Sequence, residues 1–536
     1  MRIHDLIHIT HPLEQQGHFD GEVTRMTLDS RQVRSNDVFV ALKGSESDGH
    51  RFIPDAIRKG AAVIIAENMP GQPGMPPSTT KAIGNSENLL FLKVADTREV
   101  AGELAQAFWD YPARSMKMVG ITGTNGKTTI ATLVYQVLIK LGYNTGMIGT
   151  VDTRLGSEVR PSRLTTPDAV QLAATLGEMS SLDSAFAIME VSSHALEQQR
   201  VGGISFDVAA FTNISQDHLD YHQDMASYKN AKKKLFAGLD ENAVAVVNRD
   251  DPAYKEMIDG CAASIWSFGF ESDTDFRILD ESPEGMVLDL DGTIVSTPLT
   301  GRYNAYNVAQ AYLICLALGV AKNGAAGALG EATGAPGRLE RIWECRNEVR
   351  GSAAEAETSQ GRGTAANIIP APTVFVDYAH TPDALENVLK ALHSVRSEQE
   401  TLHVVFGCGG DRDRTKRPEM GRIAEKYADA VTLTSDNPRS EEPESIIRDI
   451  RTGMTRTDNL FVEVKRRKAI RSAILEADTR TIVLVAGKGH ETYQEVHGRR
   501  NQFDDRKIAA KALTEWIDRR LSRKGAMNNN SKEEVS

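Results

Sequence analysis

The sequence predicts an α/β protein of about three domains, built on mostly parallel sheets. Three observations support this fold class. The chain has 536 residues, which is too long for a single hydrophobic core. Short apolar runs that end at polar residues alternate with helical patterns, as in parallel strands buried on both faces. A glycine-rich turn within residues 118–129 joins one such run to a helix.

This turn has the layout of a phosphate-binding loop of the P-loop type. Its glycines let backbone N–H groups surround phosphate oxygens, Lys127 adds a positive charge, and the Thr128 hydroxyl can bind Mg²⁺. Ile121 occupies the place of the first Walker A glycine, so the loop is the variant Gly123-Thr-Asn-Gly-Lys-Thr128. An ordinary glycine turn is the alternative. The correct placement of both Lys127 and Thr128 favours a nucleotide site.

Composition excludes several classes of protein. A hydrophobic content of 40% and a charged content of 25% are typical of a globular protein. The net charge of −11 argues against nucleic acid as the main partner. No apolar stretch approaches the roughly 20 residues that span a bilayer, and the N-terminus has no signal-peptide core. The 4 cysteines lack metal-ligand spacing, so reduced thiols and a cytoplasmic location without membrane insertion are expected.

Changes of pattern and composition predict three domains and a tail. The predicted boundaries are 1–113, 114–338 and 339–521, with a disordered tail at 522–536. Residues 346–372 are rich in Ala, Glu, Gly, Ser and Thr, which predicts a mobile surface insertion without a core. The third domain contains four strand–loop–helix patterns and is therefore expected to be a Rossmann-like open sheet.

Polar residues follow the predicted strands of the central domain. Glu190 ends one apolar run, and His218 lies soon after another. Ligands of parallel sheets bind beyond the carboxyl ends of the strands, and a carboxylate beside a phosphate loop suits Mg²⁺. For Glu190 alone, capping of the next helix explains the residue equally well.

Lys232 is predicted to lie on the buried face of a helix. Tyr228, Lys232, Leu235 and Phe236 share one helical face through their spacing. A buried lysine has a lowered pKa, and its neutral amine can be carbamylated by CO₂ to present oxygens to a metal. From spacing alone, a lysine that extends its ammonium group to solvent is the favoured explanation.

Two arginines follow predicted strands of the third domain. Arg412 and Arg439 suit bidentate capture of a carboxylate, whereas lysine offers a single point of charge. A solvated surface arginine is the better explanation for either residue alone.

Together these motifs resemble the Mur ligases of peptidoglycan synthesis, over nearly the whole chain. The motifs are Thr122-Gly-Thr-Asn-Gly-Lys-Thr-Thr129, Met189-Glu-Val-Ser-Ser-His194, Asn213 with Asp217-His218, Tyr303-Asn304 with Asn307, Gly337-Arg338-x-Glu340 and Asp377-Tyr-Ala-His380. Three further motifs resemble the MurE type, which adds 2,6-diaminopimelate to UDP-N-acetylmuramoyl-L-alanyl-D-glutamate. These are Thr27-Leu-Asp-Ser-Arg31, Asp436-Asn-Pro-Arg439 and Gly487-Lys-Gly-His-Glu491. Lysine-adding relatives differ at the arginine of the second motif.

The resemblance implies a role for each matching residue. ATP would be bound by Gly123, Thr124, Asn125, Gly126, Lys127, Thr128, Thr129, Asn304, Arg338 and Asp377. The UDP-sugar dipeptide would be bound by an N-terminal UDP-binding domain and its neighbour, through Leu28, Ser30, Ser45, Glu46, Ser47, Thr165, Thr166, Ser192, Gln198 and Arg200. Mg²⁺ would be bound by Thr128, Glu190, His218 and Lys232, the last as its carbamate (N6-carboxylysine). Diaminopimelate would be bound by Arg412, Asp436, Asn437, Pro438, Arg439, Gly487 and Glu491. Lys127, Glu190, His218, Lys232 and Arg338 would be catalytic.

The implied reaction joins two small molecules at the expense of ATP. ATP phosphorylates the D-glutamyl carboxylate, and the amine of diaminopimelate displaces phosphate from the acyl phosphate. No covalent nucleophile is needed, and the partners are small molecules rather than nucleic acids or membranes. A monomer is expected. The alternatives are a lysine-adding Mur ligase, a folylpolyglutamate synthase-like ligase, and a P-loop binding protein without ligase activity.

Overall fold

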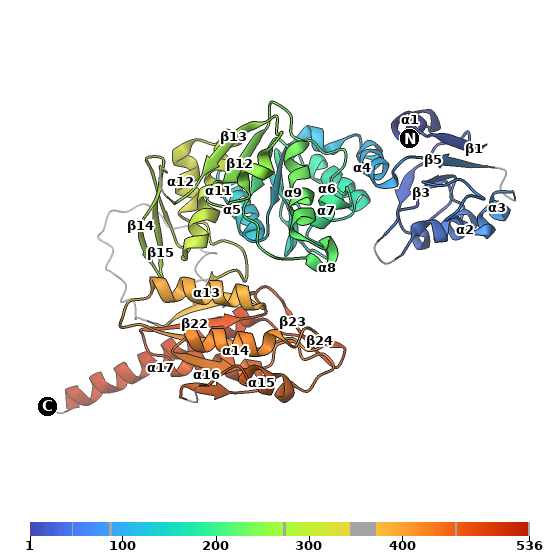
Figure 1. Cartoon of the computed structure of the whole chain (residues 1–536). Coiled ribbons are helices and arrows are strands. Elements are labelled where there is room, and N and C mark those ends of the chain that lie inside the picture. The colour runs from blue at the N-terminus through green and yellow to red at the C-terminus, as the bar shows by residue number, and fades with distance from the viewer. Residues whose placement is uncertain (45–46, 85–87, 272–274, 343–370, 456–457, 534–536) are drawn as a thin grey trace. The chain divides into compact units, whose positions relative to one another are not determined.

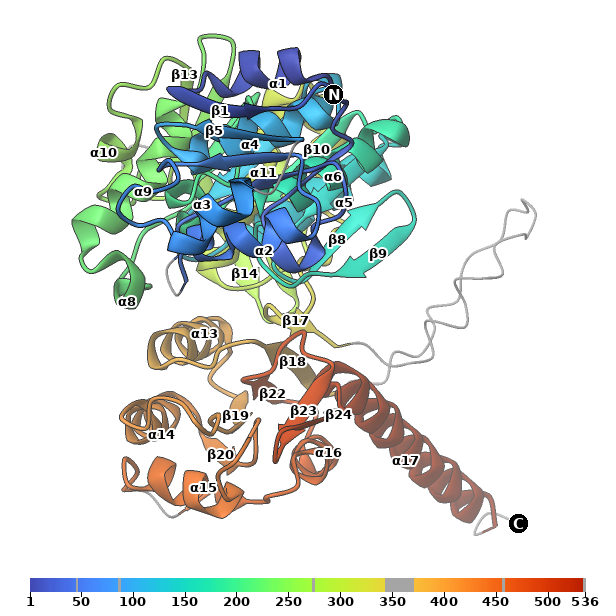
Figure 2. The same ribbon diagram turned by 90° about the vertical axis from the view of Figure 1, so that its right-hand side faces the viewer.

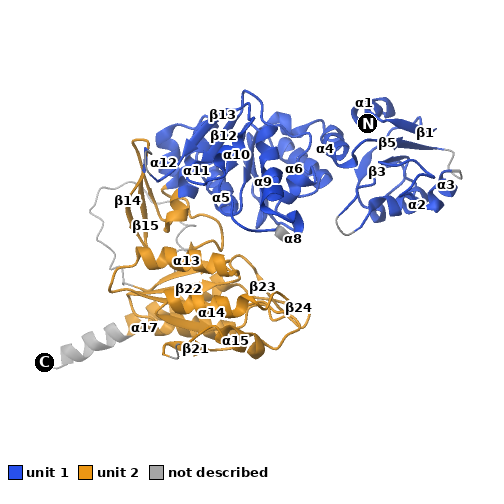
Figure 3. Cartoon of the chain, in the orientation of Figure 1, with its two compact units in different colours: residues 1–276, 306–329 blue, residues 277–305, 330–536 orange. Residues whose placement is uncertain are grey.

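The computed structural model describes the chain except for residues 45–46, 85–87, 272–274, 343–370, 456–457 and 534–536 (Figures 1 and 2). The predicted insertion at 346–372 therefore lies almost wholly outside the described residues. The chain forms two compact units, residues 1–276 with 306–329 and residues 277–305 with 330–536 (Figure 3). The first unit contains the two large sheets of the first two predicted domains, whereas residues 277–305 and 330–338 of the second predicted domain belong to unit 2. The predicted boundaries between three domains remain a proposal.

The first sheet of unit 1 has the strand order β1-β5-β4-β3-β2. Its strands are β1 (Glu14–His18), β2 (Arg25–Thr27), β3 (Asp37–Val40), β4 (Val63–Ala66) and β5 (Leu89–Lys93). Helices α1 (Ile3–Thr10) and α4 (Thr97–Phe108) pack on one face, and α2 (Ile53–Arg58) and α3 (Pro77–Gly84) on the other. In β4, Val63 and Ile65 face the first pair, whereas Ile64 and Ala66 face the second. This confirms that the apolar run is a strand buried on both faces.

The second sheet of unit 1 has the order β13-β12-β11-β6-β10-β7-β8-β9. Its strands are β6 (Lys117–Thr122), β7 (Thr145–Ile148), β8 (Asp152–Leu155), β9 (Glu158–Pro161), β10 (Phe186–Glu190), β11 (Val208–Phe211), β12 (Val244–Asn248) and β13 (Ser264–Phe268). Its helices are α5 (Lys127–Lys140), α6 (Ala169–Ser181), α7 (Ser193–Glu197), α8 (Leu219–His222), α9 (Met225–Ala237), α10 (Tyr254–Ile258), α11 (Arg302–Ala317) and α12 (Lys322–Leu329). Strand β6 pairs in parallel with β10 on one side and β11 on the other. A strand in this position opens a crevice at its carboxyl end, where ligands bind.

Unit 2 contains a six-stranded sheet of order β17-β18-β22-β19-β20-β21. Its strands are β17 (Glu340–Arg341), β18 (Thr373–Asp377), β19 (Thr401–Phe406), β20 (Ala430–Leu433), β21 (Leu460–Val462) and β22 (Thr481–Ala486). All neighbouring strands are parallel except β17. The four strands predicted in this part of the sequence are confirmed, and so is the open α/β sheet.

Helices cover both faces of this sheet (Figure 2). Ile482 and Leu484 of β22 pack with α13 (Pro382–Val395), α14 (Lys416–Tyr427) and α15 (Pro443–Arg451). Val483 and Val485 of the same strand pack with α16 (Arg466–Glu476) and α17 (Asp505–Glu533). Helix α17 continues to Glu533, through residues for which the sequence predicts a disordered tail. Residues 522–533 include Gly525 and Asn528 to Asn530, which have low helix propensity, so the extension is attributed to the helix already formed by the packed segment around Trp516.

Two small antiparallel elements of unit 2 were not predicted. One is a three-stranded sheet of β14 (Phe276–Ser282), β15 (Gly285–Leu290) and β16 (Thr293–Thr297). The other is a hairpin of β23 (Tyr493–Val496) and β24 (Arg499–Gln502). Within the described part of the chain, no helix is long and apolar enough to cross a membrane.

A buried ion pair joins helices α14 and α15 and provides a test of the fold. The guanidinium group of Arg417 is 0% exposed and donates to Glu441 at 2.8 and 3.0 Å and to Asp449 at 2.8 Å. Arg417→Met removes the buried cation from both carboxylates and leaves Glu441 only the exposed Arg414, at 2.9 Å. It should lower the free energy of unfolding by about 3 kcal/mol, measured by urea denaturation. Arg448→Met, at an exposed position of α15, should change it by less than about 0.5 kcal/mol.

The same pair should make stability depend on pH in acid. Its hydrogen bond with Arg417 lowers the pKa of Glu441 from 4.5 to about 2. Because the folded-state pKa is the lower one, this stabilisation is complete above pH 4.5 and is lost as the pH falls towards 2. The difference between wild type and Arg417→Met should therefore shrink in that range; a constant difference would contradict this account.

Candidate active site

The phosphate loop between β6 and α5 requires glycine at two positions. Gly123 has φ +145° and Gly126 has φ +88°. A Cβ atom at Gly123 would lie 1.9 Å from Oγ1 of Thr212, and one at Gly126 would lie 2.5 Å from Oδ1 of Asn307. Any larger residue would therefore displace the loop or its neighbours. Asn307 therefore lies against this loop.

The end of β11 holds the loop in place. The backbone N–H of Thr124 donates to the Asn213 carbonyl at 2.8 Å, and that of Asn125 donates to the Asn213 side chain at 3.0 Å. Helix α5 begins at Lys127, so its N-terminal N–H groups follow directly on the loop. This arrangement suits the binding of phosphate groups.

Glu190 is part of a hydrogen-bonded group beside this loop. It is 1% exposed and accepts from Oγ1 of Thr128 at 2.9 Å, from the N–H of Thr150 at 2.7 Å and from Oγ1 of Thr150 at 2.9 Å. Ser192, rather than Glu190, caps helix α7 by accepting from the N–H of Ala195. Capping therefore does not account for Glu190, whose contact with Thr128 fits the set of oxygen ligands predicted for Mg²⁺.

His218, another of the four predicted Mg²⁺ ligands, is not hydrogen-bonded to this group within the described chain. Its side chain is 47% exposed and lies 3.5 Å from Asp217. In the described part of the chain, no hydrogen bond or ion pair joins it to Glu190, Thr128 or Lys232. Nor do three or more His, Cys, Asp or Glu side chains gather into a metal site among these residues. Of the four predicted Mg²⁺ ligands, only Glu190 and His218 are His, Cys, Asp or Glu residues. The predicted magnesium site therefore also requires the Thr128 hydroxyl and the carbamate of Lys232.

Lys232 lies beneath the phosphate loop. It is 1% exposed on the same face of α9 as Tyr228, Leu235 and Phe236, which confirms that it lies on the buried face of the helix. The explanation that spacing alone favoured, an ammonium group extended to solvent, is wrong. Its Nζ atom donates to the Gly123 carbonyl at 2.8 Å. Burial, aided by the charge of Lys127, moves the pKa of Lys232 well below 10.5. A lowered pKa favours the neutral amine, which is the form that reacts with CO₂; the carbamate itself remains a prediction.

The predicted dipeptide-binding residues of the central sheet form a continuous hydrogen-bonded chain. It starts at Glu190, whose carbonyl accepts from Thr166 at 2.9 Å, and Thr166 in turn accepts from Arg200 at 2.9 Å. Arg200 also donates to Gln198 at 2.7 Å, and Gln198 donates to the hydroxyl of Tyr221 at 3.1 Å. Burial lowers the pKa of Arg200, whose guanidinium group is largely withdrawn from solvent.

Two more predicted residues join this chain from the side. Thr165 accepts from Thr150 at 3.1 Å, and Ser192 accepts from Thr166 at 3.4 Å. Thr150 and Tyr221 were missed by the sequence analysis, because neither belongs to a recognised motif.

The predicted residues of the first sheet lie in loops after β2 and β3. Ser30 begins a short 3-10 turn and is 6% exposed, and Leu28 packs against the hydrophobic core. Ser47 accepts from Gly44 at 3.0 Å through its carbonyl. Ser45 and Glu46 lie outside the described residues.

Unit 2 carries the remaining predicted ATP-binding residues. Asp377 accepts from the N–H groups of Leu339 at 2.6 Å and Ala379 at 2.8 Å, and desolvation raises its pKa. The guanidinium carbon of Arg338 lies 4.7 Å from the centroid of the Tyr378 ring. Asn304 is 2% exposed and donates to Thr300 at 2.8 Å at the start of α11.

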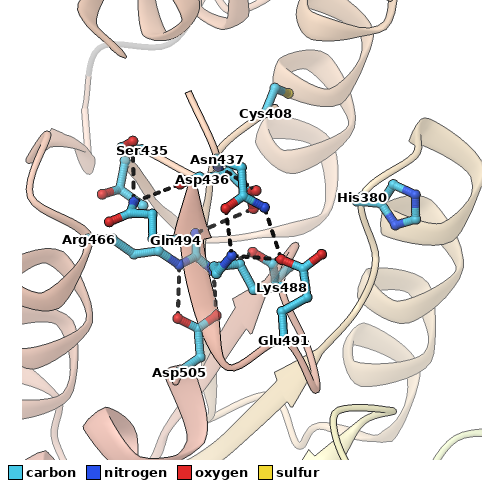
Figure 4. A network of polar contacts seen from close by, with 12 residues as sticks. His380, Cys408, Ser435, Asp436, Asn437, Arg466, Lys488, Glu491, Gln494 and Asp505 are labelled. Atoms are coloured by element: carbon cyan, nitrogen blue, oxygen red, sulfur yellow. Dashed lines mark hydrogen bonds and ion pairs between the residues drawn. The ribbon is translucent and has the colours of Figure 1, made fainter. Parts of the chain in front are cut away.

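Most of the residues predicted to bind diaminopimelate follow β20 and β22, and Figure 4 shows Asp436, Asn437 and Glu491 among them. Asn437 donates to Oε2 of Glu491 at 2.9 Å. Gly487 has φ +118°, and a Cβ atom there would lie 2.6 Å from Oδ2 of Asp436. Arg439 donates to the Gly410 carbonyl at 2.6 Å. Pro438 is buried between them, whereas Arg412 is exposed and has no hydrogen bond or ion pair with this group among the described residues.

The unpredicted hairpin supports this cluster. Gln494 donates to the Asp436 carbonyl at 2.6 Å, and the N–H of Glu495 donates to Oδ1 of Asn437 at 2.9 Å. Arg439 donates its N–H to Glu495 at 3.1 Å and accepts from His497 at 2.6 Å. Strand β23 thus lies along the Asp436–Arg439 motif.

Three non-glycine residues near this site have left-handed backbone conformations. They are Asp411 with φ 53°, Arg439 with φ 52° and His497 with φ 48°. Each of these conformations is unfavourable for a residue with a Cβ atom.

The fold and the phosphate loop define a nucleotide-binding α/β protein of the P-loop type. Three family models match the chain: the Mur ligase family catalytic domain at residues 22–109, the Mur ligase middle domain at 121–315 and the Mur ligase glutamate ligase domain at 363–489. The chain belongs to the Mur ligase family.

Similar proteins cover nearly the full chain. The UDP-N-acetylmuramoyl-L-alanyl-D-glutamate–2,6-diaminopimelate ligase of Phocaeicola vulgatus is 40% identical over 91% of this chain and 94% of its own. The enzyme of the same name from Geobacillus thermodenitrificans is 40% identical over 92% and 95%. A solved structure of a ligase of this name superposes with a TM-score of 0.65 at 31% identity, covering 95% of this chain and 98% of that one.

The buried amine of Lys232 should cost stability at neutral pH. Its folded-state pKa lies below its unfolded value, so between the two the unfolded chain holds more protons and stability rises with pH. Lys232→Met should therefore raise the melting temperature near pH 7 in CO₂-free buffer and remove the increase of stability with pH. It should also abolish ATP-dependent turnover.

Lys233→Met, on the surface of the same helix and paired with Asp259, is the control and should change neither property greatly. A lower melting temperature for Lys232→Met would show that the charged form stabilises the fold. Retained turnover would remove Lys232 from the active site.

Proposed function

We propose that this protein is an ATP-dependent ligase that adds meso-2,6-diaminopimelate to UDP-N-acetylmuramoyl-L-alanyl-D-glutamate. The observation that carries the proposal is the Asp436–Arg439 motif, held against Gly487 and Glu491 in a chain similar to diaminopimelate ligases along its whole length. The reaction belongs to the synthesis of peptidoglycan precursors.

The phosphate loop would bind ATP and place its terminal phosphate at the crevice beyond β6. Transfer of that phosphate to the D-glutamyl carboxylate yields an acyl phosphate and ADP. Both reactants are negatively charged, so catalysis depends on positioning and on cations near the transferred group. Lys127 supplies one cation at the start of α5, and Arg338 is proposed to supply another.

Mg²⁺ would neutralise the phosphate charge when bound. The hydroxyl of Thr128 and the carboxylate of Glu190 fit this ion, since both are oxygen donors and lie in contact beside the loop. His218 and the carbamate of Lys232 are proposed to complete the set.

The residues Thr165, Thr166, Ser192, Gln198 and Arg200 are proposed to hold the dipeptide of the nucleotide sugar. Their hydrogen-bonded chain starts at Glu190, so it would lead from the metal site to the substrate carboxylate. Leu28, Ser30 and residues 45–47 are proposed to hold the uridine end. We also infer that the protein is a monomer and that it is located in the cytoplasm. The use of ATP and the three free cysteines in the described part of the chain favour the cytoplasm.

In the second step the amine of diaminopimelate attacks the acyl carbon, and phosphate leaves from a tetrahedral intermediate. Arg439 is proposed to bind the distal carboxylate of diaminopimelate, the group that lysine lacks. Its guanidinium group can make two parallel hydrogen bonds to a carboxylate.

Two other functions are less well supported. A folylpolyglutamate synthase would not need the Asp436–Arg439 motif. A P-loop binding protein without ligase activity would leave the cluster around Asn437 unexplained.

The deciding experiment measures phosphate release with ATP, Mg²⁺ and the nucleotide-sugar dipeptide, with meso-diaminopimelate or L-lysine as the amine. Release should depend on diaminopimelate. Release with lysine alone would retain the reaction and overturn the amino-acid assignment, whereas no release with either would leave only a nucleotide-binding protein.

Arg439→Ala should lower kcat/KM for diaminopimelate roughly 30-fold or more, since a lost charged hydrogen-bond partner costs about 2 kcal/mol or more. The KM for ATP should not change. Arg499→Ala, at an exposed position of β24, is the control and should behave as wild type. Unchanged kinetics for Arg439→Ala would overturn its assignment.

A further inference from the structure

Lys488 is a fully buried lysine within the candidate amino-acid site to which no role has yet been given. It lies between Gly487 and Gly489 after β22 and is 0% exposed. Its Nζ atom donates to Oδ1 of Asn437 at 3.0 Å and to Oε2 of Glu491 at 2.7 Å (Figure 4). A buried ammonium group is costly unless its hydrogen bonds are satisfied by such partners.

The local backbone is shaped to turn this side chain inward. Gly487 has φ +118° and Gly489 has φ +51°, so the residues on either side of Lys488 both have positive φ. A Cβ atom at Gly489 would lie 2.7 Å from the Gly337 carbonyl and from Cβ of Tyr378. The chain therefore packs closely on both sides of Lys488, and its side chain is enclosed.

The hydrogen bonds of Lys488 determine how the Asn437 amide is oriented. Oδ1 of Asn437 accepts from Lys488 and also from the N–H of Glu495 at 2.9 Å. With two donors at its oxygen, the amide must direct Nδ2 away from them, and Nδ2 donates to Oε2 of Glu491 at 2.9 Å. Lys488 thus favours one of the two flip states of the amide.

The same contacts determine which oxygen of Glu491 can meet a ligand. Oε2 accepts from both Lys488 and Asn437. The Glu491 side chain is 17% exposed, so it reaches solvent while this oxygen is already committed. Oε1 is then the atom left for a charged donor, and an ammonium group of the incoming amino acid is such a donor.

The other fully buried cation of this region has a different set of contacts. Arg466 forms two hydrogen bonds with Asp505, at 2.9 and 2.6 Å, and donates to the Ala486 carbonyl at 2.9 Å. Its contact with the motif is a 4.0 Å approach to Asp436. Arg466 therefore ties helix α16 to α17, whereas Lys488 acts on the two side chains that face the amino-acid site.

We propose that Lys488 is a positioning residue of the amino-acid site: it holds Asn437 and Glu491 in the arrangement in which Oε1 of Glu491 receives an ammonium group of the incoming amino acid. This inference rests on the proposed function. Lys488 does not itself touch the substrate and acts through its two partners.

The test is a double-mutant cycle of Lys488→Met and Glu491→Gln in the full chain, with steady-state kinetics for each substrate. Lys488→Met should raise the KM for diaminopimelate about tenfold or more, as expected for losing a charged hydrogen bond, without changing the KM for ATP or the nucleotide sugar. The double variant should raise that KM by clearly less than the product of the two single effects, because Lys488 acts through Glu491.

The double variant keeps the proposal testable if Lys488→Met alone does not fold, because it removes both charges of the Lys488–Glu491 pair and leaves no unpaired buried charge. Its KM for diaminopimelate should then match that of Glu491→Gln alone within about twofold. Lys488→Arg keeps a cation and should restore part of the affinity. Effects that multiply fully, or a further large rise in the double variant, would overturn the proposal.

Trp516→Phe is the control for a purely structural role. Trp516 is 2% exposed on α17 and donates to the Ala477 carbonyl at 2.8 Å, remote from the Asn437 cluster in sequence and contacts. This variant should lower the melting temperature and leave the KM for diaminopimelate unchanged. If Lys488→Met behaves like it, Lys488 is structural and the proposal is wrong.

The wild-type protein separates this proposal from the proposed function. If it uses lysine instead of diaminopimelate, the cycle is measured with lysine, and only the identity of the amino acid is overturned. If it releases phosphate with neither amine, the proposed function fails and this inference fails with it.

Discussion

The Gly123 carbonyl receives hydrogen bonds from two lysines, and the structure of the nucleotide site depends on this shared acceptor. Lys127 reaches it from the start of α5 at 2.9 Å, and Lys232 reaches it from α9 at 2.8 Å. Two ammonium groups can approach one oxygen only if the loop backbone is fixed, and the positive φ of Gly123 together with its contact with Thr212 fixes it. The proximity of Lys127 also contributes to the lowered pKa of Lys232. The conformation of Gly123 thus brings together two lysines from distant parts of the chain.

The proposed amino-acid site of unit 2 has a different requirement, because it would have to accept a zwitterionic amino acid in a partly buried place. The cluster around Asn437 contains cations and carboxylates that largely satisfy one another. Such a preformed network orients its members before the ligand arrives and lowers the cost of ordering them on binding. Strand β23 supplies backbone hydrogen bonds along the Asp436–Arg439 motif and thereby holds the motif in position.

The elements that the sequence predicts correctly are those whose signal is local. Apolar runs such as residues 481–486 are strands because they are buried on both faces, and the helical period places Lys232 inside. The hairpin of β23 and β24 is polar and lacks alternation, so its register comes from long-range hydrogen bonds that no local pattern contains. The hydrogen bond from Thr150, which follows β7, to Glu190 at the end of β10 is likewise a long-range contact that no local pattern contains. Helix α17 runs into the predicted disordered tail because packing around Trp516 forms a helix that later residues can continue, and this packing is not visible in the local sequence.

The left-handed conformation of Arg439 has an evolutionary consequence. A residue with a Cβ atom gives up roughly 1 kcal/mol in this conformation, which glycine adopts freely. Replacement by glycine would therefore relax the backbone while removing the guanidinium group. With the proposed role of Arg439 in binding the distal carboxylate, substrate choice and folding stability thus favour different residues at this position. In a lineage released from selection for its amino acid, stability alone would not preserve the arginine, so its retention in a descendant would record continued use of the dicarboxylic substrate.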